Sequence, residues 1–174
     1  MLLDTSVINE IFTFWFPNDN YNNFWFDKNL DFDSTIKAKY FYLLKNIFVE
    51  IKNYDLFGMN SDELIAIIIV LDQFSRNIER TISDNERDLL SFENIHEMTE
   101  EANRLSKHWI NRKYYLNEPI NKIVFALMPL RHLNKVHDYN IIVQILDEIK
   151  YKFNDTILYN KFKNQTIKRL DLLK

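Results

Sequence analysis

The sequence predicts an all-α protein in which antiparallel helix hairpins stack on one another. Apolar residues recur at intervals of three and four along most of the chain, and no stretch alternates apolar with polar residues as a half-exposed strand does. The segments between the expected helices are short, which favours antiparallel neighbours. Because 174 residues can form one sizeable core, we expect residues 1–174 to make a single helical domain.

Two helices are expected in the first half of the chain. The first begins at Asp33 or Ser34, whose side chains can accept hydrogen bonds from a first helical turn, and it ends near Tyr54. The second spans residues 61–78, with a cap at its first residue, and contains an uninterrupted apolar run at residues 64–71.

The second half is expected to be helical as well. A stripe of apolar residues with a period of 3.6 predicts a helix over about residues 91–113. Pro119 stands where a first helical residue would, and Pro129 is expected to bend or end the helix that follows. Two further stripes predict helices around residues 139–153 and from about Thr156 onward.

The composition argues against several classes of function. Without cysteine the chain has no disulfide, no thiolate chemistry and no cysteine-bearing metal site. A net charge of −3 without a strong basic cluster argues against a nucleic-acid partner. Gly58 is the single glycine, so a glycine-rich loop that cradles phosphates cannot form, and we expect no cofactor held in that way or in any other.

We expect a cytoplasmic protein that neither enters a membrane nor binds a metal. The apolar run at residues 64–71 is far shorter than the roughly 20 residues needed to span a membrane. Asp4 and Glu10 lie where a secretory signal would carry basic residues. His132 and His137 are five residues apart, an unsuitable spacing for two ligands on one helix face. The sequence does not indicate an oligomeric state.

Two Phe-Trp-Phe triplets, at residues 14–16 and 24–26, flank a polar turn. Adjacent aromatic residues usually belong to a core, so the triplets are expected to anchor the N-terminal segment onto the helices. In a second interpretation, Trp15 and Trp25 are ligand-binding residues that line a groove for an extended peptide or a planar molecule.

A dense polar group follows the apolar run: Asp72, Gln73, Arg76 and Asn77. On a helix Asp72 faces Arg76, because residues four apart share a face. In the structural interpretation, Arg76 pairs with Asp72 and complements the helix dipole, while Asn77 ends the helix. In the functional one, Asp72 is a candidate catalytic base, and Gln73, Arg76 and Asn77 bind a ligand, with Arg76 on its anionic group.

Pro129 lies shortly before Arg131 and His132. A proline inside a helix frees a backbone carbonyl one turn earlier, and either of these side chains could satisfy it. In the alternative interpretation His132 is a second candidate catalytic residue, since histidine is suited to acid–base chemistry near neutral pH.

Four segments resemble the family called domain of unknown function 924: "FTFWF", "FWFDKNLDFDSTI", "LIAIIIVLDQFSRNIER" and "FALMPLRH". They occur in the family's order and approximate spacing over about residues 8–150. The family pattern is kept at Trp15, Trp25, Asp72, Gln73, Arg76, Asn77, Pro129 and His132. The resemblance implies a tetratricopeptide-like α-α superhelix, and it implies no activity.

Several positions depart from the family pattern. Ser75 replaces a proline, Asp27 a glycine and Arg131 a glutamate, while Leu133 and Asn134 replace a serine and a glutamate. The family's C-terminal Gly-Arg-Phe-Pro-His-Arg-Asn element is missing. If the family is enzymatic, these losses would impair its site, so we expect a divergent member and favour a non-enzymatic function over an enzymatic one.

Three hypotheses for function follow. The leading one is a non-enzymatic binding module that holds a peptide or a partner protein on a concave face, lined by Trp15, Trp25, Asp72, Arg76 and His132. The rival is a small-molecule enzyme, hydrolytic or acid/base, with Asp72 or His132 as the base and Arg76 on an anionic group. The third is a decayed family member that retains only the fold.

Overall fold

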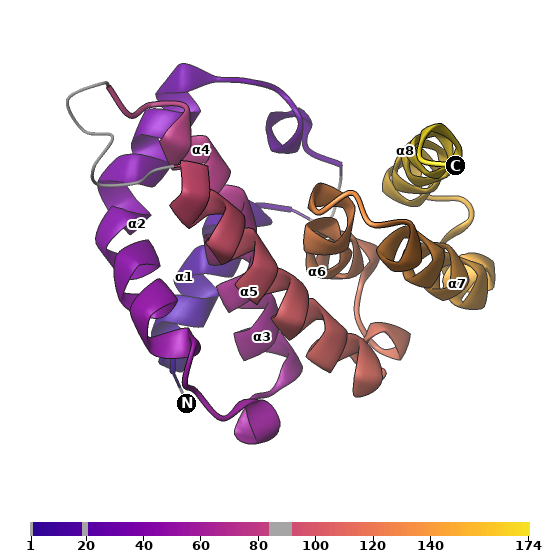
Figure 1. The fold of residues 1–174 in the computed structure, drawn as a ribbon, viewed down its shortest axis with the longest axis horizontal. Helices are drawn as coiled ribbons and strands as arrows, with labels where there is room; N and C mark the ends of the chain where they lie inside the picture. The colour runs from indigo at the N-terminus through magenta and orange to yellow at the C-terminus, as the bar shows by residue number, and fades with distance from the viewer. Residues whose placement is uncertain (1, 19–20, 84–91) are drawn as a thin grey trace.

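The computed structural model describes residues 2–18, 21–83 and 92–174, and their regular secondary structure is entirely helical. Figure 1 shows the arrangement of the elements. The α-helices are α1 (Thr5–Trp15), α2 (Leu30–Ile51), α3 (Ser61–Ile68), α4 (Ser75–Glu79), α5 (Phe92–Asn111), α6 (Ile120–His132), α7 (Val136–Phe153) and α8 (Ile157–Leu172). The other elements are the 3-10 turns η1 (Asn23–Trp25), η2 (Leu56–Gly58) and η5 (Tyr114–Leu116) and the π-helical segment η3 (Ile69–Phe74). The predicted all-α class is confirmed, whereas the superhelical arrangement stays a prediction.

Asparagines cap two helices that begin earlier than the sequence suggested. The side chain of Asn29 accepts hydrogen bonds from two backbone N–H groups in the first turn of α2. Asn60 caps α3 through one such bond. The predicted caps at Asp33 or Ser34 and at Ser61 are therefore wrong, because each of these residues already lies inside its helix.

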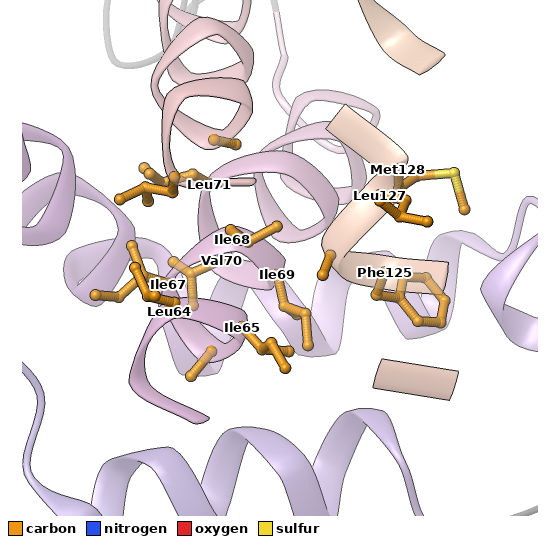
Figure 2. Packing of buried hydrophobic residues seen from close by; sticks show 14 of the residues in the cluster. Leu64, Ile65, Ile67, Ile68, Ile69, Val70, Leu71, Phe125, Leu127 and Met128 are labelled. Carbon is orange, nitrogen blue, oxygen red and sulfur yellow. The ribbon is translucent and has the colours of Figure 1, made fainter. Parts of the chain in front are cut away.

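The apolar run lies in the centre of the molecule. α3, η3 and α4 follow one another without a break, and every residue from Leu64 to Leu71 is fully buried. The elements α1, α2, α5 and α6 all contact this continuous helical stretch. Figure 2 shows its apolar side chains beside Phe125, Leu127 and Met128 of α6. A helix that is apolar on every side needs neighbours on every side, which explains the central position of this stretch.

A π-helical turn interrupts this central helix where the polar residues begin. In η3 the backbone N–H of Ser75 donates to the carbonyl of Val70, five residues back, instead of to Leu71. The carbonyl of Leu71 accepts a hydrogen bond of 2.6 Å from the hydroxyl of Ser75. The serine that replaces the family's proline thus supplies a hydrogen bond inside the π turn that a proline could not make.

The two tryptophans of the Phe-Trp-Phe triplets lie in the core. Trp15 is 1% exposed and Trp25 is 7% exposed. Nε1 of Trp25 donates a hydrogen bond of 2.8 Å to the carbonyl of Trp15, and both rings pack against Phe125. Apolar packing encloses both rings, which favours the interpretation in which the triplets anchor the N-terminal segment over the one in which the tryptophans line a groove.

The C-terminal helices α6, α7 and α8 pack against one another at one side of the molecule. Figure 1 shows α8 at the edge, beside α7. Pro129 lies inside α6, which continues for another turn and carries Arg131 and His132 to its C-terminal end. No helix in the described ranges is both long and apolar enough to cross a membrane.

Candidate functional site

The carboxylate of Asp72 is the centre of the candidate site, and it is fully buried, with 0% exposure. Its Oδ1 lies 2.8 Å from Nδ1 of His132 and 3.4 Å from Nε of Arg76. Its Oδ2 accepts a hydrogen bond of 2.6 Å from Nε2 of Gln73. Asp72, Arg76 and His132, which belong to two separate motifs, therefore meet at one point.

The neighbours of Asp72 keep it ionised. Burial disfavours the charged form, but the charge and hydrogen bond of His132, with smaller contributions from Arg76 and Gln73, lower the pKa of Asp72 below its usual value. Because a carboxylate only accepts hydrogen bonds, we infer that Nδ1 of His132 carries a proton in this pair. Nε2 of His132 has no hydrogen-bond partner in the described part of the chain.

Arg76 is held at two points. Its Nε lies beside Asp72, and its Nη2 donates a hydrogen bond of 2.8 Å to Oγ1 of Thr99 in α5. The Arg76 side chain is 32% exposed and that of His132 is 28% exposed. Both side chains therefore extend from a buried carboxylate towards solvent, in fixed positions.

Arg76 and His132 open onto a polar pocket of about 330 Å³. The pocket is lined by Arg76, Arg131, His132, Asn134, Tyr139 and Arg169. These residues come from α4, α6, α7, α8 and the turn between α6 and α7. We call this hollow the arginine pocket.

Arg131 and Arg169 bring positive charge to the arginine pocket without a matching acid. Among the described residues, neither guanidinium has a carboxylate partner. Nε of Arg131 is buried and has no hydrogen-bond partner, while its guanidinium lies 4.9 Å from the ring centre of Phe162. Burial lowers the pKa of Arg131, Tyr139 opposes that shift, and the charge of Arg169 adds to it. The pocket is therefore a region of uncompensated positive charge.

Polar contacts in the turn after α6 organise the wall of this pocket. Asn134 adopts the left-handed conformation (φ 53°), which asparagine tolerates better than most residues. Its Oδ1 lies 3.4 Å from Nε of Arg169. The hydroxyl of Tyr139 donates a hydrogen bond of 3.0 Å to the carbonyl of Arg131, which ties the start of α7 to the end of α6.

Two of the predicted ligand-binding residues point elsewhere. Gln73 is nearly buried and binds Asp72. Asn77 accepts a hydrogen bond from Arg80, which also forms two hydrogen bonds to the buried carboxylate of Asp33, at 2.7 and 2.6 Å. We call the group of Asp33, Asn77 and Arg80 the Asp33 lock, because it joins α4 to α2 and uses both carboxylate oxygens.

Sequence reasoning did not assign Arg131, Asn134, Tyr139 or Arg169 to a site. The sequence indicates Arg131 only as a side chain that could satisfy a freed backbone carbonyl, and Tyr139 only as the start of a predicted helix. A signal was present, because Arg131 replaces the family's glutamate and reverses the charge at that position. Only the packing of α8 against α6 shows where Arg169 lies. In the described ranges, no group of three His, Cys, Asp or Glu side chains could hold a metal ion.

Comparisons with known proteins place the chain among proteins of similar fold and undescribed activity. A model of the family described as "Bacterial protein of unknown function (DUF924)" matches residues 11–171. A solved structure of a protein of unknown function from Agrobacterium tumefaciens is similar with a TM-score of 0.68 and 16% sequence identity, over 98% of this chain and 84% of that one. No curated protein matches the chain. At that identity, the likeness establishes the fold alone.

Proposed function

We propose that this chain, which belongs to the DUF924 family of bacterial proteins of unknown function, binds a small anionic molecule in the arginine pocket. The observation that carries the proposal is the convergence of Arg131 and Arg169, without carboxylate partners, on the pocket that Arg76 and His132 also line. Guanidinium groups without acids beside them attract phosphate or carboxylate, which they bind through paired N–H donors.

Size and chemistry favour a small ligand over a peptide. About 330 Å³ is at the lower end of the range for small-molecule sites. The concave peptide-binding face predicted from the sequence depended on Trp15 and Trp25, and both are core residues. Of the five residues named for that face, Arg76 and His132 line the arginine pocket. The buried carboxylate of Asp72 contacts both of them.

Isothermal titration with inorganic pyrophosphate tests the proposal. We expect wild-type protein to bind it, and Arg169→Gln to weaken binding about tenfold or more, because a hydrogen bond to a charged group contributes roughly 1.5–3 kcal/mol. Arg112→Gln is the matched control, since Arg112 is an exposed arginine beside the rings of Phe57 and Tyr114, outside the pocket. Absence of binding by the wild type would contradict the proposal and favour the interpretation in which the chain retains only the family's fold.

The second candidate function is acid–base catalysis at the same site. It is favoured by the 2.8 Å contact between Asp72 and Nδ1 of His132, which orients the ring and leaves Nε2 unpartnered. In such a pair the carboxylate stabilises the imidazolium that forms when Nε2 accepts a proton from a bound molecule or water.

An activated phosphate ester is a suitable probe for catalysis. If His132 is a base, wild-type protein hydrolyses the ester above background, and His132→Gln lowers the rate by roughly a hundredfold or more. Equal rates for the two proteins would contradict the enzyme hypothesis and leave anion binding as the function.

A further inference from the structure

The arginine pocket is one of three neighbouring hollows along α8. A second hollow, of about 300 Å³, shares Arg131 and Arg169 with it and adds Gln165, Lys168 and Leu172. A third hollow, of about 240 Å³, shares Gln165 with the second. The third hollow is lined by Tyr21, Phe26, Lys161, Phe162, Asn164 and Gln165. Because neighbouring hollows share wall residues, the three lie next to one another along α8, and we call this row of hollows the groove.

The far end of this groove is aromatic. Phe26 is 41% exposed and stacks against Tyr21, with 5.8 Å between ring centres and 15° between ring planes. The ring of Phe26 is also nearly parallel to that of the fully buried Phe125, with 6.4 Å between ring centres and 19° between ring planes. Nζ of Lys161 lies 4.2 Å from the ring centre of Tyr21. A nearly parallel set of rings thus leads from the core to the surface and ends beside a cation.

The separation of the two ends is set by the helix. Phe162 and Arg169 are seven residues apart on α8, close to two turns, so they lie on the same side of it. Seven residues at about 1.5 Å each give a separation of roughly 10 Å along the helix axis. A ligand that used both ends would carry its anionic group roughly that distance from a flat ring.

We propose that the anionic ligand is a nucleoside diphosphate, with its phosphates at Arg131 and Arg169 and its base against Phe26 and Tyr21. This inference rests on the proposed function, because it assigns the anion of the arginine pocket to a nucleotide. The phosphates would be recognised by guanidinium groups, so the chain needs no glycine-rich loop to bind them. Bases stack on exposed aromatic rings with little dependence on sequence, and Lys161 adds a positive charge at the aromatic end.

The first experiment compares two probes on the full wild-type chain, ADP and inorganic pyrophosphate, by isothermal titration. We expect ADP to bind about tenfold tighter than pyrophosphate, because stacking on an aromatic side chain adds to the phosphate contacts. Equal affinity for the two probes would overturn the inference while leaving the proposed function intact. Failure of both probes to bind would overturn the proposed function as well.

Variants at the aromatic end separate the two claims further. Phe26→Ala should reduce ADP affinity to near that of pyrophosphate, with pyrophosphate affinity unchanged, whereas Arg169→Gln should weaken both probes. Phe57→Ala is the matched control, since Phe57 is exposed and lies outside the groove. Lys161→Gln gives a milder test that leaves the rings in place. Full ADP affinity in both Phe26→Ala and Lys161→Gln would overturn the inference.

A third probe distinguishes a free nucleotide from a nucleotide within a nucleic acid. We expect a ten-residue single-stranded oligonucleotide to bind more weakly than ADP, because the chain carries a net charge of −3 and a diphosphate places its charge at one end. Tighter binding of the oligonucleotide than of ADP would overturn the assignment to a free nucleotide.

Discussion

Two buried carboxylates, Asp33 and Asp72, lie in comparable surroundings and have different consequences. Each is buried and paired with an arginine, Asp72 with Arg76 of α4 and Asp33 with Arg80, the residue directly after α4. In the Asp33 lock, one guanidinium occupies both carboxylate oxygens, so charge and hydrogen bonds are matched inside the group. Asp72 instead holds Arg76 and His132 at the edge of a pocket where Arg131 and Arg169 add unmatched charge. A polar cluster whose positive and negative charges match can serve to hold helices together. A cluster with excess positive charge can also attract an anion.

The largest expected effect comes from breaking the Asp33 lock. Asp33→Asn leaves the guanidinium of Arg80 without its carboxylate, and we expect the free energy of unfolding to fall by about 3 kcal/mol. Urea denaturation measures this change. If the Asp33 lock is purely structural, pyrophosphate affinity of the folded variant stays at the wild-type value.

An exposed pair provides the control for the Asp33 lock. Glu97→Gln removes the partner of Lys52 on the surface, where both side chains are about half exposed. Such a pair contributes at most about 1 kcal/mol. A loss in Asp33→Asn no larger than in Glu97→Gln would contradict the role given to the lock.

Asp72→Asn should have a smaller effect, of about 2 kcal/mol on unfolding. The amide keeps the size of the side chain and part of its hydrogen bonding but removes the charge that pairs with Arg76 and His132. The variant should also lose the orientation of His132. Chemical denaturation at neutral pH measures the first effect, and unchanged stability would show that the buried charge makes no net contribution to folding.

The same residue predicts how stability depends on acid. The folded state lowers the pKa of Asp72, so its contribution is present above the unfolded value near 3.8 and is lost as pH falls through the lower folded value. Wild-type stability should therefore fall more steeply than that of Asp72→Asn below about pH 4. The same decrease in the free energy of unfolding with falling pH in both proteins would contradict the lowered pKa of Asp72.

Ser75→Ala tests the π-helical turn η3, which carries Asp72. Ser75→Ala removes the buried hydrogen bond from the hydroxyl to the carbonyl of Leu71, and we expect the free energy of unfolding to fall by about 1 kcal/mol. Thermal or urea unfolding measures it. An unchanged free energy of unfolding would show that the Ser75 hydroxyl does not stabilise the π turn.

The smallest effect on stability is expected at the arginine pocket. Arg169 is exposed and faces other cations, so Arg169→Gln should change the free energy of unfolding by less than about 0.5 kcal/mol, even though it weakens pyrophosphate binding. Urea denaturation in low salt measures this difference. A large destabilisation would show that Arg169 has a structural role, and it would remove the contrast between the Asp33 lock and the arginine pocket.

Much of the fold and part of the site could be predicted from the sequence. Periodicity predicted most of the helices, because the pattern of a helix repeats within a few residues. It did not predict α1, since the aromatic triplets hid the apolar stripe of residues 5–15. The convergence of Asp72 with Arg76 was visible at a spacing of four, whereas the contact with His132 joins residues 60 positions apart.

The sequence by itself determined the all-α class, the family and the identity of the polar residues that end the central helix, because each depends on local spacing or on a motif. Only the tertiary structure decided which of these residues are enclosed in the fold and which line the arginine pocket. The reason is electrostatic: the role of a charged side chain depends on whether an opposite charge lies beside it, and that partner comes from a distant helix. Arg80 forms an ion pair with Asp33 of α2. Arg131 and Arg169 lie close enough for their charges to interact, and neither has a carboxylate partner among the described residues.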